Sequence, residues 1–199
     1  MIWTAAAVLA VVFAMWRMLR TRERIRRLRL ARDGERAVGQ FLESLREEGF
    51  RVFHDVLGEQ FNIDHVLVGP KGVFTVETKT YSKPAKAKPV VQYDGVCVTV
   101  NGFKPERDPV TQAKAQARWL QDLIRESTGR SVEIRPAVVY PGWFVSSPKG
   151  VERPDVWVLN PKALPKFLEN EPDRLTAEDA RLVAFHLSRY IRARAAATL

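Results

Sequence analysis

Residues 62–79, NIDHVLVGPKGVFTVETK, predict the centre of the fold. Two apolar runs flank a Gly-Pro-Lys-Gly turn at residues 69–72, a pattern typical of a β-hairpin. Charged residues stand within these runs: Asp64 in the first, and Glu77 and Lys79 in the second. A buried sheet normally excludes unpaired charges, so this hairpin is the first candidate for a functional site.

The turn determines which residues face each other across the hairpin. We take it to be symmetric about the Pro70–Lys71 bond, so that the numbers of paired residues sum to 141. Asp64 then stands opposite Glu77, with Cβ atoms about 4.5–5.5 Å apart on one face of the sheet. Because side chains alternate with period two, Lys79 points to that face as well. A slip of one residue would put the acids on opposite faces, so the prediction depends on a turn of even length.

Two carboxylates facing each other in apolar surroundings repel and need an offsetting charge. Mg²⁺ prefers oxygen ligands and binds through one or two carboxylates while keeping several waters. Such an ion also activates water and stabilises a phosphate as charge develops. Lys79 would then orient or activate the water, or stabilise the pentacovalent phosphate. The alternative is a solvated strand end in which Asp64 is only an ion-pair partner of Lys79, since a Glu-x-Lys tripeptide alone is weak evidence.

The rest of the chain predicts an α/β (α+β) fold, a mixed central sheet flanked by helices. Strands are expected at residues 51–56, 90–100 (a hairpin around Asp94-Gly95), 133–142 and 155–160. Helices are expected around residues 38–45, from the Asp108 cap and Pro109 to 127, at 164–168, and after a Thr176/Asp179 capping box. These elements form one domain over residues 33–199, with a core at about 34–141 and a C-terminal strand and helices at 155–195. The single cysteine, Cys97, excludes an intrachain disulfide and fits a reducing compartment.

The first residues predict a membrane anchor. Residues 1–19 carry one charge, Arg17, and a spanning helix needs about 20 apolar residues. Arg17 would snorkel toward the headgroups, and Trp3 and Trp16 lie near the two ends, where interfacial aromatic residues belong. A cleaved signal peptide is the alternative, but it would carry positive charge before the apolar run rather than after it.

The basic charge of the chain is concentrated in one segment. Residues 17–32 contain eight Arg and one Glu, a net charge of +7, whereas the chain from Asp33 onward carries only +2. Positive residues beside a span stay in the cytoplasm, so the N-terminus should lie outside and the domain inside, at an inner or plasma membrane. We expect residues 20–32 to form a juxtamembrane helix whose arginines, Arg20 first, contact anionic lipid. Nucleic-acid binding by this segment is the alternative.

The order Asp, turn, apolar strand, Glu-x-Lys resembles the P-D-(D/E)-x-K nuclease superfamily, which has restriction-endonuclease-like folds. More closely, the chain resembles the nuclease-related domain (NERD) family. The matching segments are GERAVGQFLESL at 34–45, FNIDHVLVGPKGVFTVETKTYS at 61–82 and DPVTQAKAQARWLQDLI at 108–124. The segment ETKTYSK departs from the more usual Glu-x-Lys-Asn-Trp/Tyr-x-Gly, which affects the adjoining loop but neither the acids nor the lysine.

The resemblance implies a metal-dependent phosphodiesterase that acts on DNA. It implies that Asp64 and Glu77 are ligands of Mg²⁺ or Mn²⁺ and that Lys79 is the catalytic lysine. It also implies that Glu35, on the first helix, is an accessory acid and that Gln112 is a polar residue closing the site. From the residues alone, Glu35 could equally be a first-turn acid. Gln112 and Gln116, at i and i+4, could belong to an exposed polar face.

Three lysines follow the motif, and they could contact a phosphate backbone: Lys83, Lys86 and Lys88. A solvated loop is the alternative for them. His65 points away from Asp64 by strand alternation and is interpreted as structural.

The predicted function is a membrane-anchored, metal-dependent nuclease that hydrolyses phosphodiester bonds of DNA at the cytoplasmic face. The alternative is a non-catalytic nucleic-acid-binding or membrane-associated interaction module that retains the nuclease fold. The near-neutral charge of residues 33–199 favours this alternative, since duplex binding usually requires a basic surface. A degenerate relative would have lost one of Asp64, Glu77 and Lys79, and the presence of all three favours the enzyme.

Overall fold

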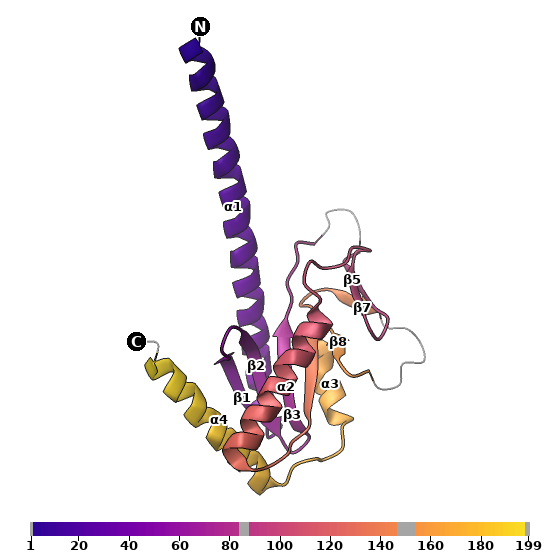
Figure 1. The fold of residues 1–199 in the computed structure, drawn as a ribbon. Helices are drawn as coiled ribbons and strands as arrows, with labels where there is room; N and C mark the ends of the chain where they lie inside the picture. Colours follow the sequence, from indigo (N-terminus) through magenta and orange to yellow (C-terminus); the bar gives the residue numbers. More distant parts are fainter. Residues whose placement is uncertain (1, 84–87, 147–153, 198–199) are drawn as a thin grey trace.

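The computed structural model describes residues 2–83, 88–146 and 154–197, without the side chains of residues 2 and 4–8. Along this part of the chain, five consecutive strands follow the first long helix, and helices and three further strands come after them (Figure 1). The helices are α1 (Ile2–Glu43), η1 (Ser44–Arg46), α2 (Pro109–Thr128), η2 (Pro161–Ala163), α3 (Leu164–Glu169) and α4 (Ala177–Ala197). The strands are β1 (Arg51–Leu57), β2 (Asn62–Gly69), β3 (Gly72–Thr78), β4 (Val90–Tyr93), β5 (Val98–Val100), β6 (Ile134–Val139), β7 (Phe144–Ser146) and β8 (Trp157–Leu159).

The main sheet has the strand order β1-β2-β3-β6-β8. β2 runs antiparallel to both of its neighbours, β1 and β3, whereas β3, β6 and β8 are parallel. β3 is therefore the central strand, and six of its seven residues are buried, the polar Thr75 and Glu77 among them. The mixed sheet flanked by helices confirms the predicted α/β class.

The β2–β3 hairpin has the predicted register. Gly69 pairs with Gly72 and His65 pairs with Val76, so the numbers of paired residues sum to 141. The turn is of even length, and one further step along the ladder sets Asp64 opposite Glu77.

Helices cover both faces of the main sheet. The end of α1 and α3 pack on one face, around Leu42, Leu67, Phe74 and Leu164. α2 and α4 pack on the other, around Val66, Leu120 and Val183. The strands that carry the predicted site therefore lie between α1 on one face and α2 on the other.

Two strands expected in the main sheet, β4 and β5, form a second sheet with β7, a strand that was not predicted, in the order β5-β4-β7. The hairpin predicted around Asp94-Gly95 is confirmed as β4 and β5. Its membership of one central sheet was wrong, because β4 pairs in parallel with β7 instead. β7 has three residues, none of them fully buried, and so carries little periodic signal.

The ends of α2 follow from its sequence. Asp108 caps the helix, accepting hydrogen bonds from the backbone N–H groups of Val110 and Thr111, and Pro109 opens it. Gly129 ends the helix with φ of 70°, a left-handed conformation that glycine adopts without steric cost. The predicted Thr176/Asp179 box is also present, since Thr176 Oγ1 accepts from the Asp179 N–H at 3.1 Å.

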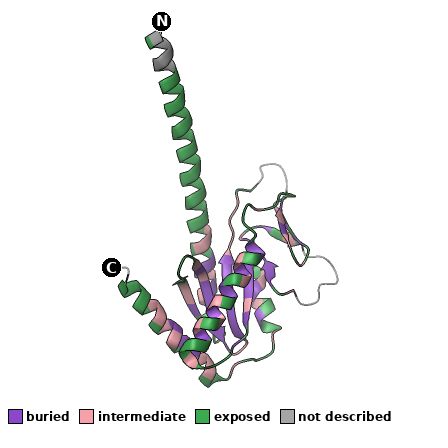
Figure 2. Cartoon of the chain, in the orientation of Figure 1, coloured by how far each residue is buried: buried purple, intermediate pink, exposed green. Residues whose placement is uncertain are grey.

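α1 is a single helix of 42 residues. Its last turns pack on the sheet, while its N-terminal two thirds project from the domain and are exposed where their side chains are described (Figures 1 and 2). The basic segment predicted as a separate juxtamembrane helix is therefore continuous with the first helix of the domain.

Among the described residues, no helix is long and apolar enough to cross a membrane, so the span predicted over residues 1–19 has no support there. The described apolar run from Leu9 to Trp16 ends at Arg17, and the side chains of residues 1, 2 and 4–8 lie outside the description. Trp3 is exposed, and the Trp16 ring lies 4.0 Å from the Arg20 guanidinium carbon. The membrane location and the orientation remain predictions.

Candidate active site

Glu77, at the end of β3, is the buried centre of a hydrogen-bonded cluster. Its side chain is 5% exposed, yet both carboxylate oxygens have partners. Oε1 accepts from Lys79 Nζ at 2.7 Å and from Gln112 Nε2 at 2.8 Å. Oε2 accepts from Gln116 Nε2 at 2.7 Å. These bonds explain how a carboxylate is tolerated in the centre of an apolar sheet.

α2 supplies the two glutamines from neighbouring turns of one face. Gln112 Oε1 accepts from Lys79 Nζ at 2.9 Å, so this amide joins the lysine and the glutamate. Gln116 is 2% exposed and also donates to the Asn62 carbonyl at 2.9 Å. The structure thus places Gln112 at the predicted position, and the alternative of an exposed polar face is wrong for Gln116.

Asp64 lies opposite Glu77 on β2. Its Oδ2 accepts a hydrogen bond from the Thr78 backbone N–H at 2.7 Å. Burial, together with the negative charge of Glu77, raises the pKa of Asp64 to about 7 from an ordinary value of 3.8. The Thr78 N–H and Lys79 lower this pKa only in part. Burial and the neighbouring carboxylate therefore both favour a proton on Asp64.

Glu35, on α1, reaches the same group of acids from the other face of the sheet. Burial raises its pKa above the usual range, and the charges of Asp55 and Glu77 raise it further. Glu35 lies on a helix as predicted. Its role as an accessory acid stays a prediction. A proton on Glu35 is stabilised by these surroundings.

Asp55, on β1, is an acid that the sequence did not single out. It lies between the ladder pairs His54–His65 and Val56–Ile63, opposite Asp64, and its φ of 52° interrupts the regular strand. Asn62 Nδ2 donates to its Oδ1 at 3.2 Å. The short turn between β1 and β2 was the available signal, because the same symmetry rule applied there pairs position 55 with position 64.

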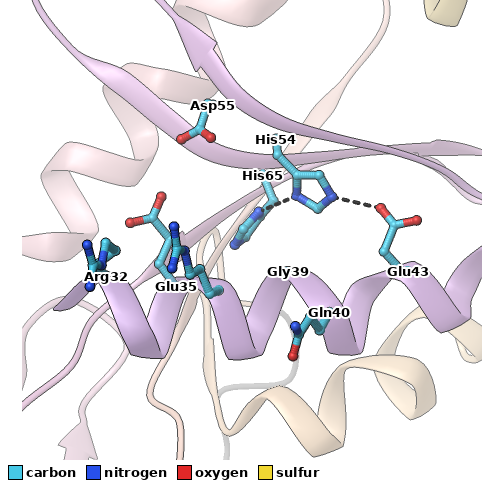
Figure 3. Close-up of a pocket in the computed structure, with 9 residues that line it drawn as sticks. Arg32, Glu35, Gly39, Gln40, Glu43, His54, Asp55 and His65 are labelled. Carbon is cyan, nitrogen blue, oxygen red and sulfur yellow. Dashed lines mark hydrogen bonds and ion pairs between the residues drawn. The ribbon is translucent and has the colours of Figure 1, made fainter. Parts of the chain in front are cut away.

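A cavity of about 720 Å³ opens between α1 and the β1–β2 hairpin (Figure 3). Of the site acids, Glu35 and Asp55 line it, whereas Asp64 and Glu77 do not. Arg32, Glu35 and Arg36 line it from α1, and Asp55 and His65 line it from the strands. The wall of the cavity therefore carries both carboxylates and guanidinium groups.

A chain of hydrogen bonds joins α1 to both strands at the far end of this cavity. His54 Nε2 lies 2.7 Å from Glu43 Oε1, and His54 Nδ1 lies 2.8 Å from His65 Nδ1 (Figure 3). His65 is buried, and this burial, with His54 beside it, lowers its pKa to about 4. Gly39 permits the close approach, since a Cβ there would lie 3.3 Å from His65 Cε1. The structural interpretation of His65 agrees with these contacts.

The residues present fit a hard divalent cation. Asp64 and Glu77 offer carboxylate oxygens on one face, and their repulsion, which after burial is the second cause of the raised pKa of Asp64, is what a cation would offset. Gln116 Oε1 is buried and has no hydrogen-bond partner among the described residues, so it adds a neutral oxygen beside Glu77. No cluster of three or more His, Cys, Asp or Glu side chains able to hold a metal occurs in the described part of the chain. A cation would therefore depend on the carboxylate pair and on water.

The lysines predicted to contact nucleic acid do not join this cluster. Lys83 and Lys88 are exposed, and a Cβ at Gly142 would lie 2.7 Å from Lys83 Nζ. Lys86 lies outside the described residues. Their role in binding a phosphate backbone stays a prediction.

The sequence model of the nuclease-related domain matches residues 30–141, more than half of the chain. The chain belongs to the nuclease-related domain family. The NERD match includes every residue of the cluster, from Glu35 to Gln116, and this confirms the predicted family. No curated protein matches the sequence.

Two solved structures are similar to the NERD chain. One is a repair endonuclease from Pyrococcus abyssi, with 18% sequence identity and a TM-score of 0.31 over 64% of this chain and 46% of that chain. The other is SfsA from Pyrococcus furiosus in complex with Ca²⁺, with 16% identity and a TM-score of 0.29 over 78% of this chain and 54% of that chain. The chain thus matches about half the length of each structure.

Proposed function

We propose that this NERD protein is a metal-dependent nuclease that hydrolyses phosphodiester bonds of DNA. The observation that supports this most is the contact of Lys79 Nζ with Glu77 Oε1 at 2.7 Å, beside Asp64 on the neighbouring strand. The order Asp, Glu-x-Lys along the sequence has become one cluster in space. Membership of a nuclease-related family supports the same activity.

Each residue of the cluster has a role in this proposal. Asp64 and Glu77 would hold a Mg²⁺ or Mn²⁺ ion, which when bound activates water and stabilises charge on the phosphate. Lys79 would place its ammonium group beside the reacting phosphate, and Gln112 would hold the lysine in that position. Glu35 would retain or exchange a proton at its carboxyl group, because its pKa is raised.

A non-catalytic binding module is the second candidate, favoured by the +2 net charge of residues 33–199. In that case the Glu77 cluster would serve only to join α2 to β3. The hydrogen bonds of Gln116 to Glu77 and to the Asn62 carbonyl have this structural effect in either case.

A cleavage assay distinguishes the two candidates. The full chain is incubated with labelled linear duplex and single-stranded DNA in Mg²⁺, in Mn²⁺, and in a chelator. We expect metal-dependent cleavage that is lost in Asp64→Asn and retained in Asp155→Asn, an exposed acid ion-paired with Lys114. DNA binding without cleavage by the wild type in either metal would support the binding module instead.

A further inference from the structure

The basic segment of α1, residues 17–32, which we call the arm, is exposed over its whole length. Few of its arginines are neutralised: Arg27 pairs with Glu23, and Arg32 lies 3.7 Å from Asp33. The described structure therefore presents a helix of net charge +7 that projects from the domain (Figure 1).

Arginines surround this helix rather than forming one stripe. At about 3.6 residues per turn, Arg22, Arg26 and Arg29 point to one side. By the same geometry, the opposite side carries a second triplet of arginines, Arg17, Arg20 and Arg24. A flat anionic surface would contact only one side of such a helix. Its apolar residues on one side, Met18, Ile25 and Leu28, form only a narrow stripe to place in lipid, with arginines on both flanks. A partner with phosphates on both sides of the helix matches this distribution better.

The major groove of duplex DNA is such a partner. It is about 12 Å wide and admits an α-helix, whose diameter with side chains is about 10–12 Å. Continuous basic helices are one known way of occupying it. From Arg17 to Arg32 the helix rises about 22 Å, at about 1.5 Å per residue, which is less than one turn of the duplex, about 34 Å.

The helix also leads directly to the candidate active site. The next turn of α1 after Arg32 carries Glu35 and Arg36, and all three residues line the cavity that Asp55 borders (Figure 3). α1 is uninterrupted from the basic segment to Glu43, so the segment has a fixed direction relative to the acids.

We infer that residues 17–32 bind duplex DNA, with the helix lying in the major groove and arginines on both of its sides contacting phosphates. This inference rests on the proposed function and specifies its substrate as double-stranded. The domain itself carries little net charge, so this segment supplies most of the electrostatic affinity.

The test is the salt dependence of DNA binding by the full chain, measured in a chelator on a fluorescent 30-base-pair duplex. One variant has Arg22, Arg26 and Arg29 replaced by Gln, and a second has Arg17, Arg20 and Arg24 replaced by Gln. The slope of log K against log salt is negative, and each lost phosphate contact reduces its magnitude by about 0.9. The magnitude of the slope should therefore be smaller by about 2.7 in each variant. Circular dichroism confirms that the variants keep their helix.

Two controls accompany these variants. Arg181, Arg189 and Arg192 on α4 are exposed, and replacing them by Gln makes the same change of charge elsewhere, which should leave the slope unchanged. Replacing the two arm triplets by Lys keeps the charge and should preserve most of the slope.

Several results would overturn the inference. The slope could be unchanged in both arm variants, or lowered in only one of them, which would indicate a one-sided contact. Alternatively, the arm variants could lose binding to phosphatidylglycerol vesicles while their duplex slope stays unchanged, which would assign the arm to lipid. Cleavage of the same duplex in Mn²⁺ by the wild type is measured separately. Cleavage with unchanged slopes rejects the arm inference alone, and lowered slopes without cleavage reject the proposed catalysis alone.

Discussion

Gln116 on α2 donates a 2.7 Å hydrogen bond to Glu77 on β3, a residue 39 positions earlier in the chain. Both side chains are buried, and the bond completes the set of donors around a carboxylate in the centre of the sheet. This hydrogen bond therefore both joins α2 to the sheet and supplies a donor to the carboxylate of the candidate site.

Removing this amide should destabilise the protein. In Gln116→Leu, Glu77 Oε2 loses its donor, and a buried acceptor without a partner costs about 1–3 kcal/mol, more for a charged group. Urea denaturation should show this loss in the free energy of unfolding. Gln121→Leu is the matched control, since Gln121 bonds only to the Val132 carbonyl from the same helix and is partly exposed. An equal loss in both variants would mean that the Glu77 bond has no special weight.

Lys79→Ala should reduce the rate of DNA cleavage while leaving the fold intact. Loss of one group that stabilises developing charge typically lowers kcat by about 10²–10³-fold. Single-turnover cleavage in Mn²⁺ measures this rate. Lys166→Ala removes an exposed lysine on α3 that pairs with Glu169 and should cut at the wild-type rate. Wild-type cleavage by Lys79→Ala would remove the lysine from the mechanism.

Asp64 should make the metal-free protein less stable as the pH rises. Its pKa is about 7 in the folded state and close to 3.8 when unfolded, so its stabilising contribution is complete below pH 4 and is lost as the pH rises through 7. Asp64→Asn removes this loss while keeping an acceptor for the Thr78 N–H. Urea denaturation measures the free energy of unfolding at each pH. Between pH 4 and pH 8, the difference in this free energy between the variant and the wild type should shift in favour of the variant by on the order of 3 kcal/mol. Parallel pH profiles for the two proteins would contradict the raised pKa.

His65, the next residue along β2, should have the opposite effect. Its pKa is lowered to about 4 from 6.5, so its contribution is complete above pH 6.5 and is lost as the pH falls through 4. As the pH is lowered, the free energy of unfolding of His65→Gln should fall by on the order of 2 kcal/mol less than that of the wild type. His186→Gln, on α4, is the control. An unchanged acid limb in His65→Gln would mean that the His54–His65 pair does not limit stability at low pH.

The sequence was sufficient to predict the hairpin and its register, because a short symmetric turn determines both. β2 ends at Gly69 and β3 begins at Gly72, and every further pair of the hairpin follows from the turn between them. α2 was predictable for a similar reason, since its cap and its terminating glycine are local signals. Asp64, Glu77 and Lys79 could therefore be placed together before any tertiary contact was known.

The remaining features depend on contacts between distant segments. The small sheet forms because β7, only three residues long, pairs with β4, and no local pattern shows that pairing. Asp55 enters the site through a positive φ in an otherwise regular strand. The Glu43–His54–His65 chain requires α1 to cross over β1 and β2, with Gly39 at the contact. Sequence periodicity does not show the β4–β7 pairing or the Glu43–His54–His65 chain, and for Asp55 only the short β1–β2 turn gave a signal.

The most direct test is calorimetric titration of Mn²⁺ into the full chain at pH 8, where Asp64 is ionised, beside an Asp64→Asn/Glu77→Gln double variant. The same titration of Asp155→Asn is the control for the loss of a surface charge. All titrations are repeated with duplex DNA present. We expect saturable binding to the wild type and to the control, and none to the double variant. Equal binding to the double variant and the wild type, or no binding to the wild type with DNA present, would contradict a cation site made by these two carboxylates.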